Sequence, residues 1–108
     1  RKLINGCVNI TGGGIGDNIE RIIPKKLCAR IDLDKIKTHK IFSWINKNGV
    51  SQKEMLKTFN CGVGFCLIIK KNNLNKVLKF FSKQYRPYII GEVIKNKTKV
   101  RYTSNIRW

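Results

Sequence analysis

The chain has 108 residues, with 23 Lys and Arg against 6 Asp and Glu, and its formal net charge is +17. This length allows one small domain and is too short for a two-domain enzyme. The longest apolar run, residues 62–69, is far short of the roughly 20 residues that a membrane-spanning helix needs, and the first residues have no apolar signal region, so we expect a cytoplasmic protein with no membrane partner.

The positive charge is spread along the chain. Lys greatly outnumbers Arg, and Ile and Asn are also frequent, a combination typical of a general compositional bias. Two clusters stand out, and we expect each to be a solvated face rather than a nucleic-acid site, because runs of charge usually serve solubility. The clusters are Lys70, Lys71, Lys76, Lys79 and Lys83, and then Lys95, Lys97, Lys99 and Arg101.

Residues 12–14 are three consecutive glycines, followed by an apolar stripe and then by Pro24. Glycine loses more backbone entropy on folding than other residues, so such a run indicates close approach of a chain segment or a ligand. Either the amides of the loop and the following helix start bind a phosphate or carboxylate, or the glycines form a tight turn under a sheet. The phosphate fingerprints G-x-G-x-x-G and G-K-[ST] are not matched. The stripe predicts a short helix and consists of Ile15, Ile19, Ile22 and Ile23.

Three elements follow Pro24. Alternation predicts a strand over residues 28–33. Helical spacing predicts a helix over residues 38–48 that packs into the core and ends at Gly49. A capping box predicts another helix over residues 52–58, in which two side chains each bind the other residue's backbone amide. The capping pair is Ser51 and Glu54.

Residues 58–69 form the second informative stretch. Both faces of the strand expected here are apolar or small, so we predict a central strand. Sheet interiors otherwise avoid glycine, and Gly62 and Gly64 therefore indicate close approach by a ligand or by a packed helix.

The last third of the chain predicts one helix and two strands. Asn72 or Asn73 caps a helix over residues 74–85, which ends before Pro87. A strand over residues 88–94 and a turn near Asn96 precede an edge strand over residues 99–103. The order of elements predicts an α+β fold, a mixed β-sheet covered by helices.

Cysteine and histidine form no metal or redox motif. The cysteines have no C-x-x-C spacing, and Cys61 and Cys66 are expected on opposite faces of one strand. His39 is the only histidine, so we predict no metal site, assign no catalytic residue and expect buried free thiols. The four cysteines are Cys7, Cys28, Cys61 and Cys66.

Four motifs, in order and spacing, resemble the C-terminal part of the phosphoribosylaminoimidazole (AIR) synthetase family, also called the phosphoribosylformylglycinamidine cyclo-ligases. The resemblance covers nearly the whole chain. The motifs are Asn-Ile-Thr-Gly-Gly-Gly at 9–14, Asn-Ile-Glu-Arg-Ile-Ile-Pro at 18–24, Glu-Met at 54–55 with Thr-Phe-Asn-Cys-Gly-Val-Gly at 58–64, and Ile-Gly-Glu-Val at 90–93.

The resemblance implies that residues 1–108 are the latter part of such a C-terminal α+β domain, which is therefore incomplete. The N-terminal domain, which in this family supplies the dimer interface, most ATP contacts and the acidic metal ligands, is absent. We therefore expect the chain to be inactive alone. The implied partners are its own N-terminal domain, a second copy in a homodimer, formylglycinamidine ribonucleotide, ATP and Mg²⁺.

The implied reaction is ATP-dependent closure of an imidazole ring. ATP phosphorylates the formamide oxygen of formylglycinamidine ribonucleotide, and an amidine nitrogen then attacks, which gives aminoimidazole ribonucleotide, ADP and phosphate. Such chemistry depends on positioning and charge stabilisation more than on a covalent nucleophile.

The resemblance also implies a set of phosphate- and substrate-binding residues. Asn18 and Arg21 either face the cleft or brace the glycine loop, and Asn60 either binds substrate or caps a turn. Asn9 stands where the family usually has His, and because an amide cannot titrate we expect a structural role at this position. The full set is Thr11, Gly12, Gly13, Gly14, Asn18, Arg21, Asn60, Gly62 and Gly64.

Two other functions are compatible with the sequence. One is a relative that also activates an oxygen with ATP, such as formylglycinamidine synthetase, selenophosphate synthetase or a hydrogenase maturation factor, although the motif at 58–64 favours the cyclo-ligase. The other is a small basic nucleic-acid-binding module, which the small number of aromatic residues among the lysines disfavours.

Overall fold

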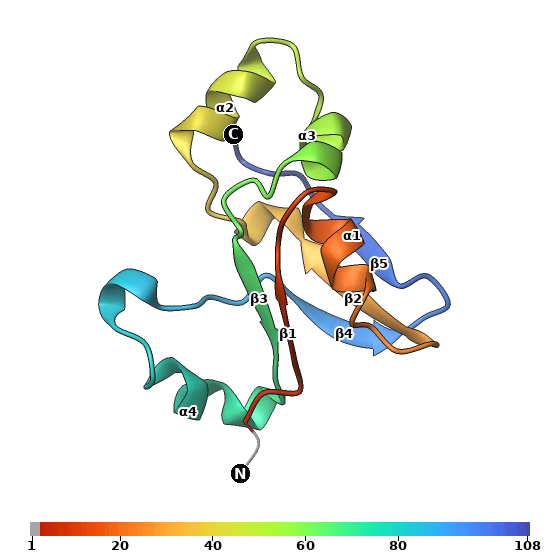
Figure 1. The fold of residues 1–108 in the computed structure, drawn as a ribbon, viewed down its shortest axis with the longest axis vertical. Coiled ribbons are helices and arrows are strands. Elements are labelled where there is room, and N and C mark those ends of the chain that lie inside the picture. Colours follow the sequence, from red (N-terminus) through yellow and green to blue (C-terminus); the bar gives the residue numbers. More distant parts are fainter. Residues whose placement is uncertain (1–2) are drawn as a thin grey trace.

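The computed structural model describes residues 3–108 and contains two small sheets (Figure 1). In the first, β1 (Gly6–Asn9) pairs antiparallel with β3 (Phe65–Ile68). In the second, β2 (Leu27–Asp32) lies between β4 (Gly91–Lys95), its antiparallel neighbour, and β5 (Val100–Thr103), its parallel neighbour. With the helices, these mixed sheets confirm the predicted α+β class, although the expected single sheet is divided in two.

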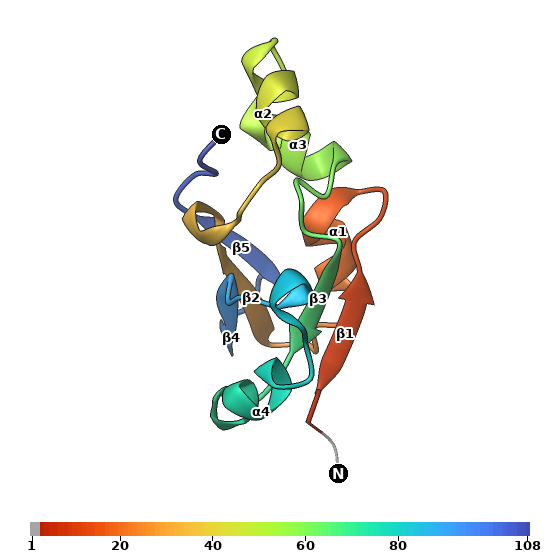
Figure 2. The ribbon, with the colours of Figure 1, turned by 90° about the vertical axis from the view of Figure 1, so that its left-hand side faces the viewer.

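The first helix, α1 (Gly14–Glu20), contacts β1 of one sheet and β5 of the other (Figures 1 and 2). Three residues of the predicted apolar stripe, Ile15, Ile19 and Ile23, belong to the main core, whereas Ile22 is half-buried and lies with Ile23 beyond the end of α1. Burying each such side chain stabilises the fold by about 1.5–3 kcal/mol relative to leaving it in water. The remaining buried core residues are Ile10, Ala29, Ile31, Leu33, Ile36, Met55, Leu56, Cys61, Val63 and Ile106.

The next two helices are α2 (Lys40–Lys47) and α3 (Gln52–Thr58), close to their predicted bounds. Gly49 has φ +107°, as expected of a residue that ends a helix. Half of the capping box is present, because the Ser51 hydroxyl accepts from the Glu54 amide at 3.3 Å. The other half is not formed, since the Glu54 carboxylate accepts from the Thr58 hydroxyl instead.

The prediction that α2 packs into the core is confirmed for only one side of the helix. No residue of α2 is buried, and the side chains of Ile41 and Trp44 are 57% and 62% exposed. Only one side of the helix, with Phe42 and Ile45, packs against the core. Apolar side chains therefore lie on two sides of α2, and only one of these sides packs against the core.

The predicted helix over residues 74–85 is also wrong in extent. A short 3₁₀ turn, Lys71–Asn73, leads into α4 (Leu74–Leu78), and a second 3₁₀ turn follows at Lys83–Tyr85. Val77 is the one buried residue of α4. Beyond Leu78, Phe81 and Tyr85 of the predicted apolar face are 38% and 71% exposed, so burial does little to stabilise a longer helix.

The sequence predicted where the strands lie along the chain better than it predicted which strands pair. In the described residues β3 pairs with β1 alone and begins at Phe65, so it is not the central strand predicted, and the predicted strand residues before Phe65 lie in a loop. The edge position of β5 and the turn at Asn96, whose side chain accepts from the Thr98 amide, are confirmed.

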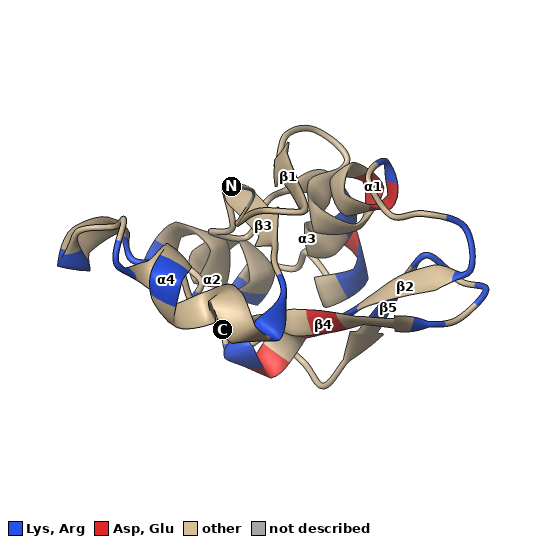
Figure 3. Cartoon of the chain, turned by 90° about the horizontal axis from the view of Figure 1, so that it is seen from below, with Lys and Arg blue, Asp and Glu red and all other residues tan. Residues whose placement is uncertain are grey.

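Lys and Arg lie on several separate elements, including α4 and the loops beside β2 and β5 (Figure 3), in agreement with the dispersed charge of the sequence.

None of the helices in residues 3–108 is long and apolar enough to cross a bilayer.

Gly14 provides a test of how α1 and α3 approach each other. Its φ is +76°, and a Cβ at this position would lie 1.9 Å from the Leu56 carbonyl oxygen. We expect Gly14→Ala to lower the free energy of unfolding in urea by about 3 kcal/mol or more, from clash and backbone strain together. Gly49→Ala is the control, since its φ is also positive but its surroundings are open, and it should cost only about 1 kcal/mol. Equal losses for the two variants would contradict the close α1–α3 contact.

Candidate functional site

The two glycine-containing motifs meet at one end of the β1–β3 sheet. Antiparallel pairing places Asn9, the last residue of β1, opposite Phe65, the first residue of β3. Beyond that pair, the Ile10 amide donates to the Gly64 carbonyl at 2.9 Å. The loop of residues 11–14, called the glycine loop here, therefore lies beside the loop of residues 60–64, which we call the second loop.

The glycine loop is a tight turn with a partly open backbone. The Gly14 amide donates to the Thr11 carbonyl at 3.2 Å, and Gly13 and Gly14 have φ of +95° and +76°. Among the described residues the amides of Gly12 and Gly13 donate to no protein acceptor, and a Cβ at Gly12 would meet nothing within 4 Å. Gly14 therefore closes a packed turn, as one of the two interpretations expected, while Gly12 faces open space, and anion binding at the loop stays a prediction.

Asn18 is the residue that holds this loop. It is only 1% exposed, and its side-chain amide donates to the carbonyls of Gly14, Thr11 and Gly12 at 2.7, 3.2 and 3.4 Å. Its side-chain oxygen accepts from the Thr11 hydroxyl at 3.2 Å and from the Arg21 guanidinium at 3.4 Å. Asn18 therefore braces the glycine loop, which was one of its two predicted roles. Arg21, at the end of α1, contacts the Asn18 side chain.

The second loop is held in the same way. The Asn60 side-chain oxygen accepts from the Gly62 amide at 2.8 Å, so Asn60 caps the turn. Thr38 donates to the Cys61 carbonyl at 2.7 Å from the segment before α2. Gly62 has φ +97° and packs near the Lys37 carbonyl, whereas Gly64 is exposed and open. Gly64 is therefore the glycine of this loop that a ligand could approach.

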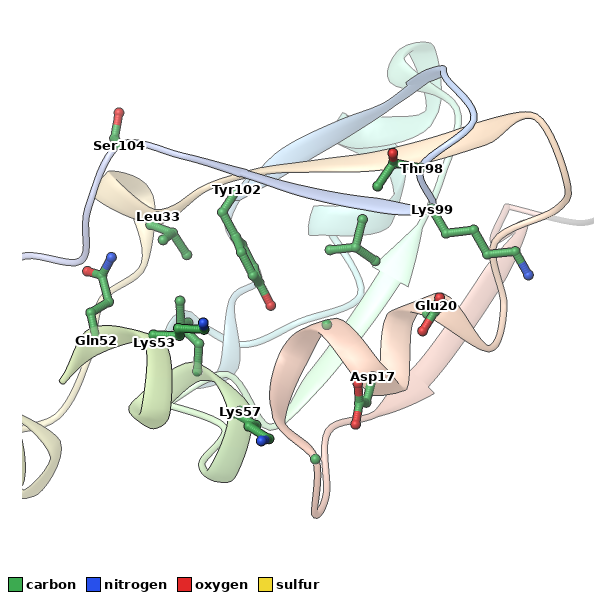
Figure 4. A pocket seen from close by; sticks show the side chains of 14 residues that line it. Asp17, Glu20, Leu33, Gln52, Lys53, Lys57, Thr98, Lys99, Tyr102 and Ser104 are labelled. Atoms are coloured by element: carbon green, nitrogen blue, oxygen red, sulfur yellow. The ribbon is translucent and has the colours of Figure 1, made fainter. Parts of the chain in front are cut away.

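A groove of about 560 Å³ adjoins the glycine loop (Figure 4). We call it the mixed-charge groove; it is lined by Gly13 and α1, by Leu33, by α3 and by residues 98–104 around β5. Asp17 and Glu20 come from α1, and Lys53 and Lys57 come from α3. The sequence analysis did not identify these residues, although the charges three and four residues apart were a signal that each pair shares a helix face.

Tyr102 lies in this groove and its ring points toward α1 (Figure 4). A Cβ on Gly16 would lie 2.6 Å from the Tyr102 hydroxyl, so only glycine allows this contact. Burial raises the pKa of Tyr102, a hydrogen bond with the Gly16 backbone lowers it, and electrostatic interactions with Asp17 and Cys61 raise it. The phenol is protonated at neutral pH and can donate a hydrogen bond.

The cysteines are all free. Burial raises the pKa of the Cys61 and Cys66 thiols to about 11, so neither is an activated nucleophile. Cys28 and Cys61 are buried as predicted, Cys66 is half-buried, and the prediction is wrong for Cys7, which is exposed on the edge strand β1. Within residues 3–108, His, Cys, Asp and Glu form no group of three or more that could hold a metal ion.

Comparisons with known proteins agree on one family. The sequence model described as AIR synthase related protein, C-terminal domain, matches residues 1–103. The chain is 39% identical over 95 residues to the trifunctional purine biosynthetic protein adenosine-3 of Chironomus tentans, covering 87% of this chain and 7% of that protein. It is 34% identical over 102 residues to a phosphoribosylformylglycinamidine cyclo-ligase of Prochlorococcus marinus (strain NATL1A), covering 93% of this chain and 30% of that protein. The chain thus spans less than a third of the length of either relative.

The bracing role of Asn18 leads to a charge-dependent prediction. Asn18→Asp replaces an amide donor with a carboxylate that faces three carbonyl oxygens, and we expect it to lower the free energy of unfolding by about 3 kcal/mol at neutral pH. Burial would raise the pKa of the new carboxyl in the folded state, so stability lost at neutral pH returns as the pH falls and the group regains a donor. Asn18→Ala is the control, because its loss should not depend on pH in this way. An Asn18→Asp variant as stable as the parent at neutral pH would contradict the bracing role.

The two raised thiol pKa values predict a loss of stability in alkali. The folded chain holds these protons up to about pH 11, whereas an ordinary thiol releases its proton near 9.0. Their contribution is fully present below pH 9.0 and is lost as the pH rises through about 11, because only the unfolded state ionises in that range. Denaturant unfolding of Cys66→Ala should therefore show a smaller alkaline loss than the parent, and the exposed-site control Cys7→Ala should match the parent. An unchanged alkaline loss in Cys66→Ala would refute this assignment.

Proposed function

The chain belongs to the AIR synthase related protein family, through its C-terminal domain, and on that premise we propose that it forms part of an ATP-dependent cyclo-ligase of purine biosynthesis. The proposed substrate is formylglycinamidine ribonucleotide, and the products are aminoimidazole ribonucleotide, ADP and phosphate. The rest of the enzyme would be a domain N-terminal to this chain, together with a second copy in a homodimer. The matched relatives support this proposal, since one is named as a purine biosynthetic protein and the other as a phosphoribosylformylglycinamidine cyclo-ligase.

The proposed chemistry begins with transfer of the γ-phosphoryl group of ATP to the formyl oxygen. An amidine nitrogen then attacks the activated carbon, the C–N bond of the imidazole forms, and the C–O bond breaks with release of phosphate. In the family that the chain resembles, the acidic metal ligands belong to the N-terminal domain, so we assign Mg²⁺ to that domain and no step to it here.

The observation that carries the proposal is the meeting of the two loops beside open backbone. Gly12 and Gly64 are both exposed, and neither would bring a Cβ within 4 Å of another atom. In our proposal the amides of Gly12 and Gly13 hold a phosphate of the substrate or nucleotide, since backbone amides suit an anion that must be held without a side chain. Asn18 would contribute by keeping this loop in shape before the ligand binds.

A graft tests the proposed reaction. In the Prochlorococcus cyclo-ligase, the 102 matched residues would be replaced by this chain, and ADP release would be measured with formylglycinamidine ribonucleotide. We expect ADP and aminoimidazole ribonucleotide in equal amounts. A folded dimeric graft that responds instead to formylglycinamide ribonucleotide with an ammonia source, or to selenide, would contradict the cyclo-ligase assignment in favour of a related ligase.

Gly12→Ala in the graft tests the role of the loop. Because its surroundings are open, the added methyl should change the free energy of unfolding by less than about 0.5 kcal/mol, yet it should obstruct an anion at the Gly12 amide and lower kcat/KM by at least about tenfold. Gly12 is preferred to Gly13, whose φ of +95° and contact with Asp17 would strain the fold itself. Full activity of Gly12→Ala would refute anion binding at this loop.

A further inference from the structure

The mixed-charge groove has walls of opposite charge that face each other across open space. Asp17 and Glu20 lie on α1, whereas Lys53 and Lys57 lie on α3, and in Figure 4 the side chain of Lys57 lies across from Asp17. All four side chains are exposed. Opposite charges so arranged leave room for a ligand between them.

These charges are not used by the protein itself. In residues 3–108 the ion pairs are Arg30 with Glu92 and Arg107 with Asp34, so none of the four groove residues is paired. Lys99 also extends to this groove, on the side of Glu20 (Figure 4), and it too is unpaired. Glu20 therefore has Lys99 on its own side of the groove, whereas Asp17 faces Lys57 across the groove.

Between the walls the surface is largely uncharged. Leu33, Leu56 and Val100 contribute apolar area, and the Tyr102 hydroxyl supplies a hydrogen-bond donor close to Gly16. A groove of about 560 Å³ falls in the size range of roughly 300–1,000 Å³ that small-molecule sites occupy. The shape and charge suit a ligand with an anionic end, an uncharged ring-sized middle and a cationic end.

We propose that the mixed-charge groove binds a phosphate monoester that carries an amidinium group at its other end. The phosphate lies against Lys53 and Lys57, the ribose lies over Tyr102, and the amidinium lies against Asp17. This inference rests on the proposed function, because formylglycinamidine ribonucleotide has these two charged groups separated by a ribose. It assigns the ribose phosphate to the lysines of α3 and leaves the amides of the glycine loop for the phosphoryl group that is transferred.

Binding to this chain can separate the two ends of the ligand. Titration calorimetry would use formylglycinamidine ribonucleotide, ribose 5-phosphate as the anionic half, and acetamidine as the cationic half. Lys57→Gln should raise the Kd of ribose 5-phosphate by about five- to tenfold and leave acetamidine unchanged, and Asp17→Asn should do the reverse. Both variants should raise the Kd of formylglycinamidine ribonucleotide. Lys76→Gln on α4, outside the groove, is the control and should change none of the three.

The outcomes distinguish this inference from the proposed function. If the graft closes the ring but Lys57→Gln and Asp17→Asn change neither its KM nor the three affinities, the groove assignment is wrong and the cyclo-ligase proposal stands. If the graft is inactive but the two variants separate the probes as described, the groove assignment stands and the reaction is wrong. If Lys76→Gln and Lys57→Gln raise the Kd of ribose 5-phosphate equally, the phosphate is bound by general positive charge, and the groove site is overturned.

Discussion

The buried side chain of Asn18 is the constraint on which the candidate site depends. One carboxamide contacts three carbonyl oxygens of the glycine loop and accepts from Thr11 and Arg21. A buried amide without partners would be costly, so these bonds make the loop conformation and the burial of Asn18 mutually dependent. In the part of the chain that the structure describes, the Gly12 and Gly13 amides of this braced loop donate to no protein acceptor.

Strand pairing and helix packing bring the other parts of the site to this loop. The β1–β3 register places the second loop beside the glycine loop, and the close contact of Gly14 with α3 positions Lys53 and Lys57 opposite Asp17. Tyr102 approaches from β5 because Gly16 has no side chain. Segments far apart in the sequence thus line one groove, and α1 contacts two of them, α3 and β5.

Local patterns in the sequence predicted the elements that depend on local physics. The isoleucine stripe of α1, the alternation of β2 and the Ser51 cap of α3 all depend on residues within one or two turns. The exposure of Trp44 and Tyr85 could not be predicted, because periodicity identifies an apolar face without showing whether this chain covers it. The burial of Asn18 depends on hydrogen bonds to a loop, and the position of Tyr102 depends on sheet pairing, so neither has a signal in local composition.

The most direct test of this account is an NMR titration of the ¹⁵N-labelled chain with inorganic phosphate. The account predicts that the amide protons of Gly12 and Gly13 shift downfield with a single saturable curve, while that of Gly14, already bonded to the Thr11 carbonyl, stays in place. The account would be contradicted if the Gly14 amide resonance shifted to the same extent. It would also be contradicted if the Gly12 and Gly13 resonances did not shift while those of lysine-rich segments elsewhere did.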